Sequence, residues 1–95
     1  MTYFIYILAS RPHGAIYIGK TTDLRRRLDQ HRNGEAESHT KKYDIFTLVY
    51  FEAHGTLEAA FERERKLKRW KRKWKDELIE SVNLEWVDLS ADIPL

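Results

Sequence analysis

The sequence predicts a small α+β domain whose elements follow the order ββαβαα. Two short runs rich in aromatic and β-branched residues, 3–9 and 15–18, are predicted strands, and a third such run covers 46–52. Apolar residues recur at helical spacing after the second run and again after the third. The chain has 95 residues, and we expect one domain spanning residues 1–95.

Turn and capping residues bound the first two strands and the helix after them. Residues 10–14 have the composition of a turn, which makes the two strands a β-hairpin. We expect a helix over 22–32, with Thr22 as its N-cap because a threonine side chain can accept a hydrogen bond from the first turn. Asn33 and Gly34 form a fitting C-terminal stop for this helix.

The helix over 22–32 is predicted to direct polar groups toward the sheet. Leu24 and Leu28 are its apolar positions, and residues three, four or seven apart share a helix face. Arg27 and His31 belong to the same face as the two leucines. Burial of that face therefore points a guanidinium and an imidazole at one neighbour, which we expect to be the sheet that carries Tyr17.

The second half of the chain is predicted to contain a loop, a strand and a long helical stretch. Residues 35–43 are polar and are predicted to form a loop. A helical pattern covers 57–82 after the candidate N-cap Thr56, and its length makes us expect a break near 69–71. The segment 83–95 is expected to be irregular and acidic and to pack on the body of the domain. Its predicted apolar anchors are Trp86, Val87 and Leu89.

A glutamate interrupts the apolar stripe of the long helical stretch. The stripe consists of Ala60, Leu67, Trp70, Trp74 and Leu78, and we expect the tryptophans to be core residues. Glu64 occupies the missing inward position. Burial of a carboxylate is costly unless the group is paired, hydrogen-bonded or bound to a cation. Around this stripe, nine of the thirteen residues 63–75 are lysine or arginine.

The charges of the chain are unevenly distributed. The formal net charge is +2, but residues 1–75 carry +8 and residues 76–95 carry −6. A basic body with an acidic tail favours a polyanionic partner, with a solvated charged surface as the alternative. The charge pattern therefore indicates nucleic acid as one class of ligand without establishing it.

Composition makes several other classes of protein unfavourable. The sequence has no cysteine, which excludes a disulfide framework and a cysteine-based zinc site. The longest apolar run, 4–9, is too short to span a membrane, and no basic region precedes it as in a secretory signal. We therefore expect a cytoplasmic location and no membrane partner.

A set of five side chains has the chemistry needed to hydrolyse a phosphodiester: Tyr6, Tyr17, Arg27, His31 and Glu64. This reaction needs an activated water, a cationic clamp and usually a metal ion. Arginine clamps phosphate with two parallel hydrogen bonds, one carboxylate with waters can hold magnesium, and tyrosine or histidine moves protons. The structural alternatives are core aromatics, a surface ion pair, a histidine at a helix C-terminus and a salt-bridged glutamate.

These residues fall in a pattern that resembles the GIY-YIG nuclease superfamily over nearly the whole chain. The two short motifs of that family lie on the strands of an N-terminal hairpin, and Phe4-Ile5-Tyr6 and Tyr17-Ile18-Gly19 occupy their places here. The similarity continues through 21–31, 48–52, Arg63-Glu64 with Leu67-Lys68, and Asn83 with Trp86 and 88–89. The sequence is most similar to small single-domain members, related to the GIY-YIG domains of excision-repair and structure-specific endonucleases.

The resemblance implies both a fold and a reaction. The family fold is a small three-stranded, largely antiparallel sheet flanked by helices. The family activity is cleavage of a DNA phosphodiester with a single Mg²⁺ or Mn²⁺ ion. For this chain the implied substrate is branched, damaged or single-stranded DNA, with RNA as an alternative, and the implied context is DNA repair or recombination.

The resemblance also implies roles for individual residues. By position, Glu64 would hold the metal ion and Arg27 would hold the scissile phosphate, so we expect these two side chains to face each other across the sheet surface. Proton transfer, water positioning and orientation of the phosphate would fall to Tyr6, Tyr17 and His31, with one of the tyrosines as general base. Secondary polar positions of the active site would be Lys20 and Asn83.

Two departures from the family pattern bear on how the chain would bind DNA. Phe4 stands where the name-giving members have the glycine that opens the first motif, which affects the approach of substrate to that strand. We also expect no separate DNA-binding domain, so affinity would come from basic side chains or would require a homodimer or a protein partner. The candidate nucleic-acid-binding residues are Arg26, Lys41, Lys42, Lys68, Arg69, Arg72 and Lys73.

Two other functions compete with the nuclease hypothesis. The first is a nucleic-acid-binding module without catalysis, in which the basic residues at 63–75 contact phosphates and the tryptophans between them stack on bases. The second is an interaction protein whose acidic tail covers the basic face or docks a partner. The presence of all five catalytic residue types favours the nuclease.

Overall fold

The computed structural model describes residues 1–35 and 38–94 of the chain. Its three strands are β1 (Tyr3–Ala9), β2 (Ile16–Thr21) and β3 (Thr47–His54). Its helices are α1 (Leu24–Arg32), α2 (Ser38–Lys42), α3 (Leu57–Arg69) and α4 (Arg72–Val82). The strands form an antiparallel sheet in the order β2-β1-β3, so the expected α+β fold with a three-stranded sheet is confirmed.

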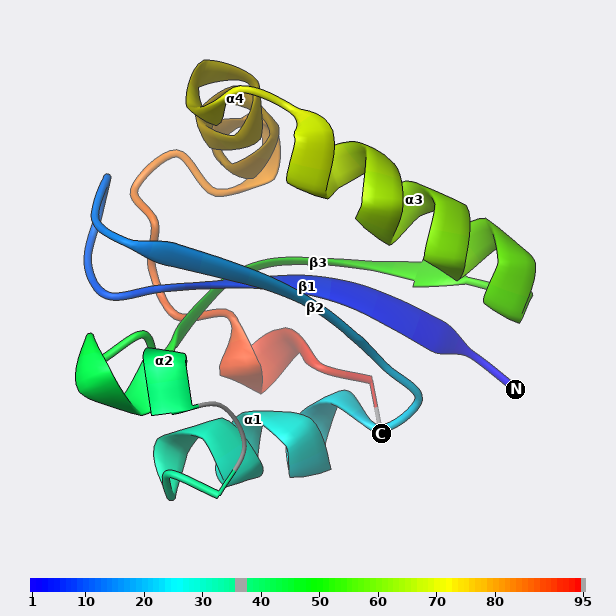
Figure 1. Cartoon of the computed structure of the whole chain (residues 1–95), viewed down its shortest axis with the longest axis horizontal. Helices are drawn as coiled ribbons and strands as arrows, with labels where there is room; N and C mark the ends of the chain where they lie inside the picture. Colours follow the sequence, from blue (N-terminus) through cyan, green and yellow to red (C-terminus); the bar gives the residue numbers. More distant parts are fainter. Residues whose placement is uncertain (36–37, 95) are drawn as a thin grey trace.

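The sheet lies between two layers. Figure 1 shows α3 and α4 over one face, and α1, α2 and the C-terminal segment over the other. The central strand β1 contributes buried side chains to both layers, because successive residues of a strand point to opposite faces. Ile5 and Ile7 pack with the α3–α4 layer, whereas Tyr6 and Leu8 pack with the α1 layer.

The hairpin register determines which side chains share a face. Tyr6 is paired with Gly19, and Leu8 is paired with Tyr17, so both tyrosines lie on the α1 side of the sheet. Lys20 follows Gly19 on β2, and because successive residues of a strand point to opposite faces, Lys20 belongs to the α3 side. The two tyrosines of the hairpin therefore share one face of the sheet.

The start of α1 differs from its prediction by two residues. The N-cap is Asp23, whose carboxylate accepts a hydrogen bond from the backbone N–H of Arg26 at 3.1 Å, and not Thr22. The hydroxyl of Thr21 accepts from the N–H of Asp23 at 3.1 Å, which fixes the cap before the helix begins. The helix ends as predicted, because its last turn is followed by Gly34 at a φ of 72°, a conformation that glycine adopts easily.

The prediction of a loop over 35–43 is wrong where the structure describes the segment. Residues 38–42 form α2, and the prediction for residues 36 and 37 lies outside the described residues. Thr40 is fully buried on this short helix and contacts His31. Tertiary contact, which the sequence pattern does not reveal, therefore accompanies a helix for which the local sequence has only a weak preference.

The helical stretch after β3 is broken between Arg69 and Arg72, close to the break predicted near 69–71. Thr56 caps α3 by accepting from the N–H of Ala59 at 3.1 Å, and the chain is extended at Trp70 and Lys71 before α4 begins. The expectation that all tryptophans are core residues is wrong, because Trp74 is 46% exposed. No helix among the described residues is long and apolar enough to cross a membrane.

The C-terminal segment crosses from α4 to the α1 side of the sheet (Figure 1). It is irregular apart from a short 3₁₀ turn at Ser90–Asp92, and Trp86 anchors it in the core. Val87 is 56% exposed, contrary to its prediction as an anchor. Asp88 accepts a hydrogen bond from Arg32 of α1 at 3.1 Å, so this end of the acidic tail does not cover the basic surface of α3.

Candidate active site

Three buried polar side chains meet between β1, α1 and α2. The Tyr6 hydroxyl lies 2.9 Å from Nε2 of His31, and Nδ1 of His31 lies 3.2 Å from Oγ1 of Thr40. Tyr6 is 1% exposed, and the other two residues are fully buried. Both ring nitrogens of the histidine therefore have partners, which holds the imidazole in one place because an unpaired buried polar group costs about 1–3 kcal/mol.

Gly19 provides the space that the phenol of Tyr6 occupies. A Cβ at position 19 would lie 2.4 Å from both Cζ and the hydroxyl oxygen of Tyr6, far inside van der Waals contact. The absence of a side chain at this position therefore makes room for the hydroxyl of Tyr6 where it lies. The only signal for this role in the sequence is a glycine directly after the predicted strand over 15–18, and a glycine in or beside a strand often marks the close approach of another group.

Arg27 completes the polar group around the Tyr6 hydroxyl. Its guanidinium hydrogen-bonds to Tyr6 and, through Nη1, to Oε1 of Gln30 at 3.2 Å. Burial raises the pKa of Tyr6 to about 12, and the hydrogen bond from Arg27 offsets this rise only in part. Tyr6 is therefore a neutral phenol at physiological pH, which can both donate and accept hydrogen bonds.

Tyr17 lies beside the same histidine but nearer the surface. Its ring centroid is 5.1 Å from that of His31 and 6.3 Å from that of Tyr6. The side chain of Tyr17 is partly exposed, whereas Tyr6 is buried. This difference in exposure separates two tyrosines that the sequence leaves equivalent.

Glu64 approaches the same part of the sheet from the opposite layer. Its side chain is 17% exposed, with Oε1 3.4 Å from Nζ of Lys20 and Oε2 3.3 Å from Nζ of Lys68. The expectation that this carboxylate faces Arg27 is wrong, because the two lysines bind its oxygens. Its charge nevertheless contributes to the raised pKa of Tyr6, so Glu64 and Arg27 act on one hydroxyl from the two layers.

The described residues offer one carboxylate to a metal ion at this site. Within residues 1–35 and 38–94, no group of three or more His, Cys, Asp or Glu side chains could hold a metal. Magnesium commonly takes only one or two carboxylates, with waters and phosphate oxygens as its other ligands. Glu64 fits that requirement once Lys20 and Lys68 release it.

The two secondary candidates lie in different places. Lys20 is in contact with Glu64 and so belongs to the candidate site. Asn83 is 5% exposed, and its Nδ2 donates to the carbonyls of Val49 and Val87, each at 2.9 Å. Its Oδ1 accepts from the N–H of Val87 at 3.1 Å. Asn83 therefore fastens the C-terminal segment to β3, which is a structural role.

The seven basic residues expected to bind nucleic acid do not form one surface. Arg26, Lys41 and Lys42 are exposed on α1 and α2, whereas Lys68, Arg69, Arg72 and Lys73 are exposed on α3 and α4, over the other face of the sheet (Figure 1). Arg72 also has internal partners, because its Nε donates to Asp76 at 2.7 Å and its Nη2 donates to the carbonyl of Gly14. That residue ties α4 to the hairpin turn and is a poor candidate for contact with phosphate.

The antiparallel sheet, the two tyrosines of its hairpin and the glutamate of α3 are the features of a nuclease-type domain. A family model described as the GIY-YIG catalytic domain matches residues 2–77. The chain therefore belongs to the GIY-YIG family, and the resemblance noted in its motifs is confirmed. GIY-YIG nucleases generally use divalent metal ions.

Relatives of similar length carry the name UPF0213 protein. One from Bacillus pumilus is 34% identical over 83 residues, which cover 87% of this chain and 84% of the relative. One from Streptococcus pneumoniae is 38% identical over 76 residues, which cover 80% and 76%. The solution NMR structure of a UPF0213 protein from Bacillus halodurans matches with a TM-score of 0.56 and 31% identity over 87% of both chains. These names state no activity, so the reaction must be argued from the site.

Proposed function

We propose that this chain is a metal-dependent endonuclease that hydrolyses DNA phosphodiester bonds. The observation that carries the proposal is the arrangement around the Tyr6 hydroxyl, where His31 and Arg27 contact it and the charge of Glu64 acts on it from the other layer. A small core is not stabilised by gathering ionisable groups around one phenol, because burying them costs free energy. Functional sites are where such groups cluster.

Arg27 and Glu64 have the chemistry to stabilise a phosphodiester during cleavage. Arg27 would form charge-assisted hydrogen bonds to the scissile phosphate, and its contact with Tyr6 sets the position of the guanidinium. Glu64 would hold a single Mg²⁺ or Mn²⁺ ion, which would supply positive charge near the phosphate oxygens and lower the pKa of a bound water. Lys20, once displaced from Glu64, would remain close enough to contact a phosphate.

Exposure distinguishes the roles that we propose for the two tyrosines. Tyr17 is partly exposed and would accept the proton of the attacking water as the general base. Tyr6 is buried and neutral, and it would position His31 and Arg27 through its hydroxyl. A phenolate base predicts cleavage that accelerates as the pH rises from 7 to 9, because a larger fraction of the base is then ionised.

The test of this function is a cleavage assay with labelled substrates. Purified protein would be incubated with linear duplex, branched and single-stranded DNA and with RNA, in the presence of Mg²⁺, Mn²⁺ or EDTA. We expect cleavage that requires the metal ion and that prefers branched or single-stranded DNA, as in repair or recombination. Arg27→Ala and Glu64→Gln should each lower the rate by about 100-fold or more, because each removes charge stabilisation of the transition state.

Matched variants and the second candidate function complete this test. Glu85→Gln and Arg11→Ala change the same residue types at exposed positions away from the site and should cleave at the wild-type rate. Equal cleavage by Glu64→Gln and wild type would contradict the proposal of a metal-dependent endonuclease. A protein that binds DNA but cuts none of these substrates with either metal would favour the non-catalytic binding module, for which the exposed basic residues of α3 and α4 argue.

A further inference from the structure

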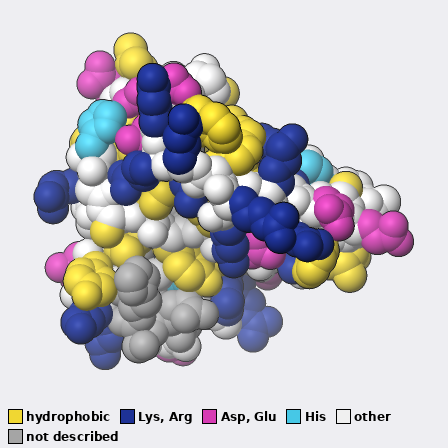
Figure 2. Space-filling view, turned by 45° about the horizontal axis from the view of Figure 1, so that its top comes forward, with side chains coloured by type: hydrophobic (Ala, Val, Ile, Leu, Met, Phe, Trp, Pro, Cys, Tyr) yellow, Lys and Arg dark blue, Asp and Glu magenta, His cyan; other side chains and the backbone are white. Residues whose placement is uncertain are grey.

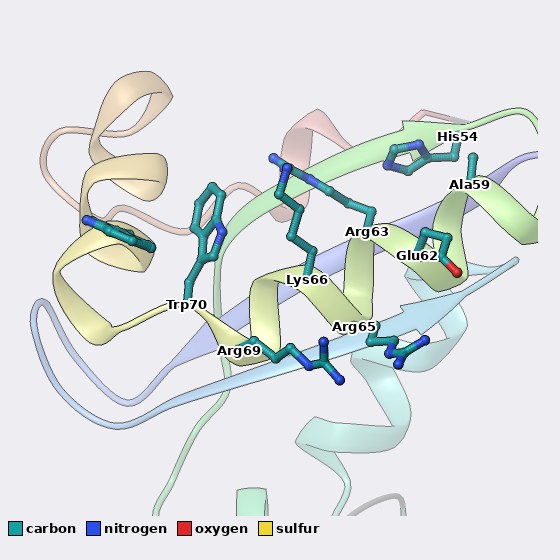
Figure 3. Close-up of a pocket in the computed structure, with 9 residues that line it drawn as sticks. His54, Ala59, Glu62, Arg63, Arg65, Lys66, Arg69 and Trp70 are labelled. Carbon is teal, nitrogen blue, oxygen red and sulfur yellow. The ribbon is translucent and has the colours of Figure 1, made fainter.

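A concave surface separate from the candidate active site lies between α3, α4 and the end of β3. The strand β3 forms the opposite edge of the sheet from β2. The concave surface encloses about 800 Å³. This α3–α4 groove is lined mainly by Arg63, Arg65, Lys66, Arg69, Trp70 and Trp74 (Figure 3). The residues of the candidate active site described above are not among those that line the groove.

The break between α3 and α4 builds the aromatic part of the groove. Trp70 and Lys71 are extended, which turns the chain so that the rings of Trp70 and Trp74 lie 6.1 Å apart at 88°. Arg63 lies 5.4 Å from the centre of the Trp70 ring and donates to both oxygens of Glu52, at 2.9 and 3.2 Å. The wall formed by Trp70 and Arg63 is therefore fixed before any ligand binds.

Trp74 is the aromatic side chain of the groove that is open to a ligand. It is 46% exposed, which is a large solvent-accessible area for an indole. The ammonium of Lys71 lies 4.7 Å from its ring centroid, so a cation accompanies the exposed ring. An exposed indole beside cations is the combination that stacks a nucleobase and neutralises its phosphate.

The cations of the groove are available for an anionic ligand. Arg65, Lys66 and Arg69 are exposed, and in the part of the chain that the structure describes no carboxylate lies within 4.0 Å of them. Figure 2 shows lysine and arginine side chains gathered over this face, with hydrophobic side chains between them. Glu62 contributes one negative charge to the lining, which leaves the groove strongly basic.

We propose that the α3–α4 groove binds an unpaired segment of nucleic acid, with a base stacked on Trp74 and the adjoining phosphates held by Lys66 and Arg69. Paired bases are excluded as the occupant, because their faces are covered within a duplex. The role of the groove rests on the proposed nuclease function: it would select substrates whose unpaired strand continues past the cleavage site. That strand must cross α3, a helix about 10–12 Å in diameter.

The binding test separates stacking from charge. Wild-type protein in EDTA would be titrated with oligothymidylate, with binding followed by the anisotropy of a labelled strand and stacking followed by tryptophan fluorescence. We expect quenching, because Trp74 is exposed whereas Trp86 is only 3% exposed and cannot reach a base. Trp74→Ala should abolish most of the quenching and weaken binding by about 5- to 150-fold, the range for loss of one stacked base.

Further arms of the experiment test how much charge contributes to binding and whether DNA or RNA is preferred. An abasic strand of the same length should bind weakly and without quenching, since it offers phosphates alone. The double variant Lys66→Ala/Arg69→Ala should reduce the dependence of log affinity on log salt concentration by about 1.4, at about 0.7 per phosphate contact in single strands. Oligouridylate in place of oligothymidylate distinguishes RNA from DNA as the preferred strand.

Matched variants keep the result interpretable. Leu84→Ala removes an exposed apolar side chain outside the groove, and Arg11→Ala removes one exposed charge elsewhere, and both should bind as the wild type does. Trp74→Phe keeps a stacking ring and should retain most of the affinity. Melting curves of every variant show whether the fold is intact.

Three outcomes would overturn the proposal: equal affinity of Trp74→Ala and wild type, equal quenching by the abasic strand, or tighter binding of duplex than of single strand. Equal quenching by polyglutamate would also overturn it, because the groove would then be a general site for acidic chains. The outcome is independent of catalysis, since no metal ion is present. A protein that binds as expected but cleaves no substrate would contradict only the nuclease proposal. A protein that cleaves but does not show this binding would contradict only the groove proposal.

Discussion

Substitution of alanine for Gly19 tests how closely the hairpin holds Tyr6. The new Cβ would lie 2.4 Å from the phenol, whereas ordinary contact begins at about 3.4 Å, so the ring must move by about 1 Å. A shift of this size either breaks the 2.9 Å hydrogen bond to His31 or forces the phenol against it. Overpacking costs about 1–3 kcal/mol and a lost hydrogen bond about 0.5–1.5 kcal/mol.

The expected result of Gly19→Ala is a less stable and much less active protein. Alanine is about 0.5–1 kcal/mol better than glycine within a strand, which reduces the net loss of unfolding free energy to about 1–3 kcal/mol. In a domain of this size the melting temperature should fall by roughly 5–20 °C. Cleavage should fall by about 100-fold, because a displacement of 1 Å at a catalytic group has that effect.

A double-mutant cycle assigns this loss to the contact with Tyr6. Leucine at position 6 lacks Cε1, Cζ and the hydroxyl, which are the three atoms nearest the new Cβ. In the Tyr6→Leu background, urea unfolding should therefore find Gly19→Ala neutral or slightly stabilising. An equal loss of stability in both backgrounds would refute the reasoning, as would Gly19→Ala with wild-type stability.

Four further substitutions test other parts of the structure. Tyr6→Phe should lower the unfolding free energy by about 1–3 kcal/mol because it removes the buried hydrogen bond between the Tyr6 hydroxyl and Nε2 of His31, whereas Tyr17→Phe should lower the cleavage rate by about 100-fold with little change in melting temperature. Asn83→Ala removes three hydrogen bonds and should cost about 2–4 kcal/mol in urea unfolding. Burial raises the pKa of Glu52, but hydrogen bonds led by that from Arg63 outweigh it and hold the pKa below 4.5. The unfolded state therefore binds more protons, so stability should fall as the pH drops below about 4.5, and Glu52→Gln should flatten that fall.

The sequence was sufficient to predict the parts of the fold that depend on local composition, helical spacing and the cap of α3. The aromatic and β-branched runs of the first strands, the leucines of α1 and the cap at Thr56 follow from local composition and spacing, and the structure has each of them. The shared face of Leu28 and His31 is likewise a property of helix geometry. These features are local, and that is why pattern alone was enough.

The features that were missed depend on contacts between distant segments. Thr40 lies in a polar stretch, and its burial depends on His31 and the chain that follows α1. The pairing of Glu64 with Lys20 joins residues 44 positions apart, across the packing of α3 on β2. Neither contact leaves a periodic signal, so the sequence indicated that Glu64 needs a partner without indicating Lys20 as one of them.

The most direct test of the central claim is a crystal structure of the protein with Mn²⁺ and an uncleaved DNA strand, with the ion located by anomalous scattering. The account predicts one Mn²⁺ ion bound to the Glu64 carboxylate in place of Lys20 and Lys68, with a DNA phosphate between that ion and Arg27. It also predicts that Tyr17 lies nearer the phosphate than Tyr6. A Glu64 carboxylate still bound by both lysines, with Mn²⁺ elsewhere, would contradict the claim that the two layers form one active site.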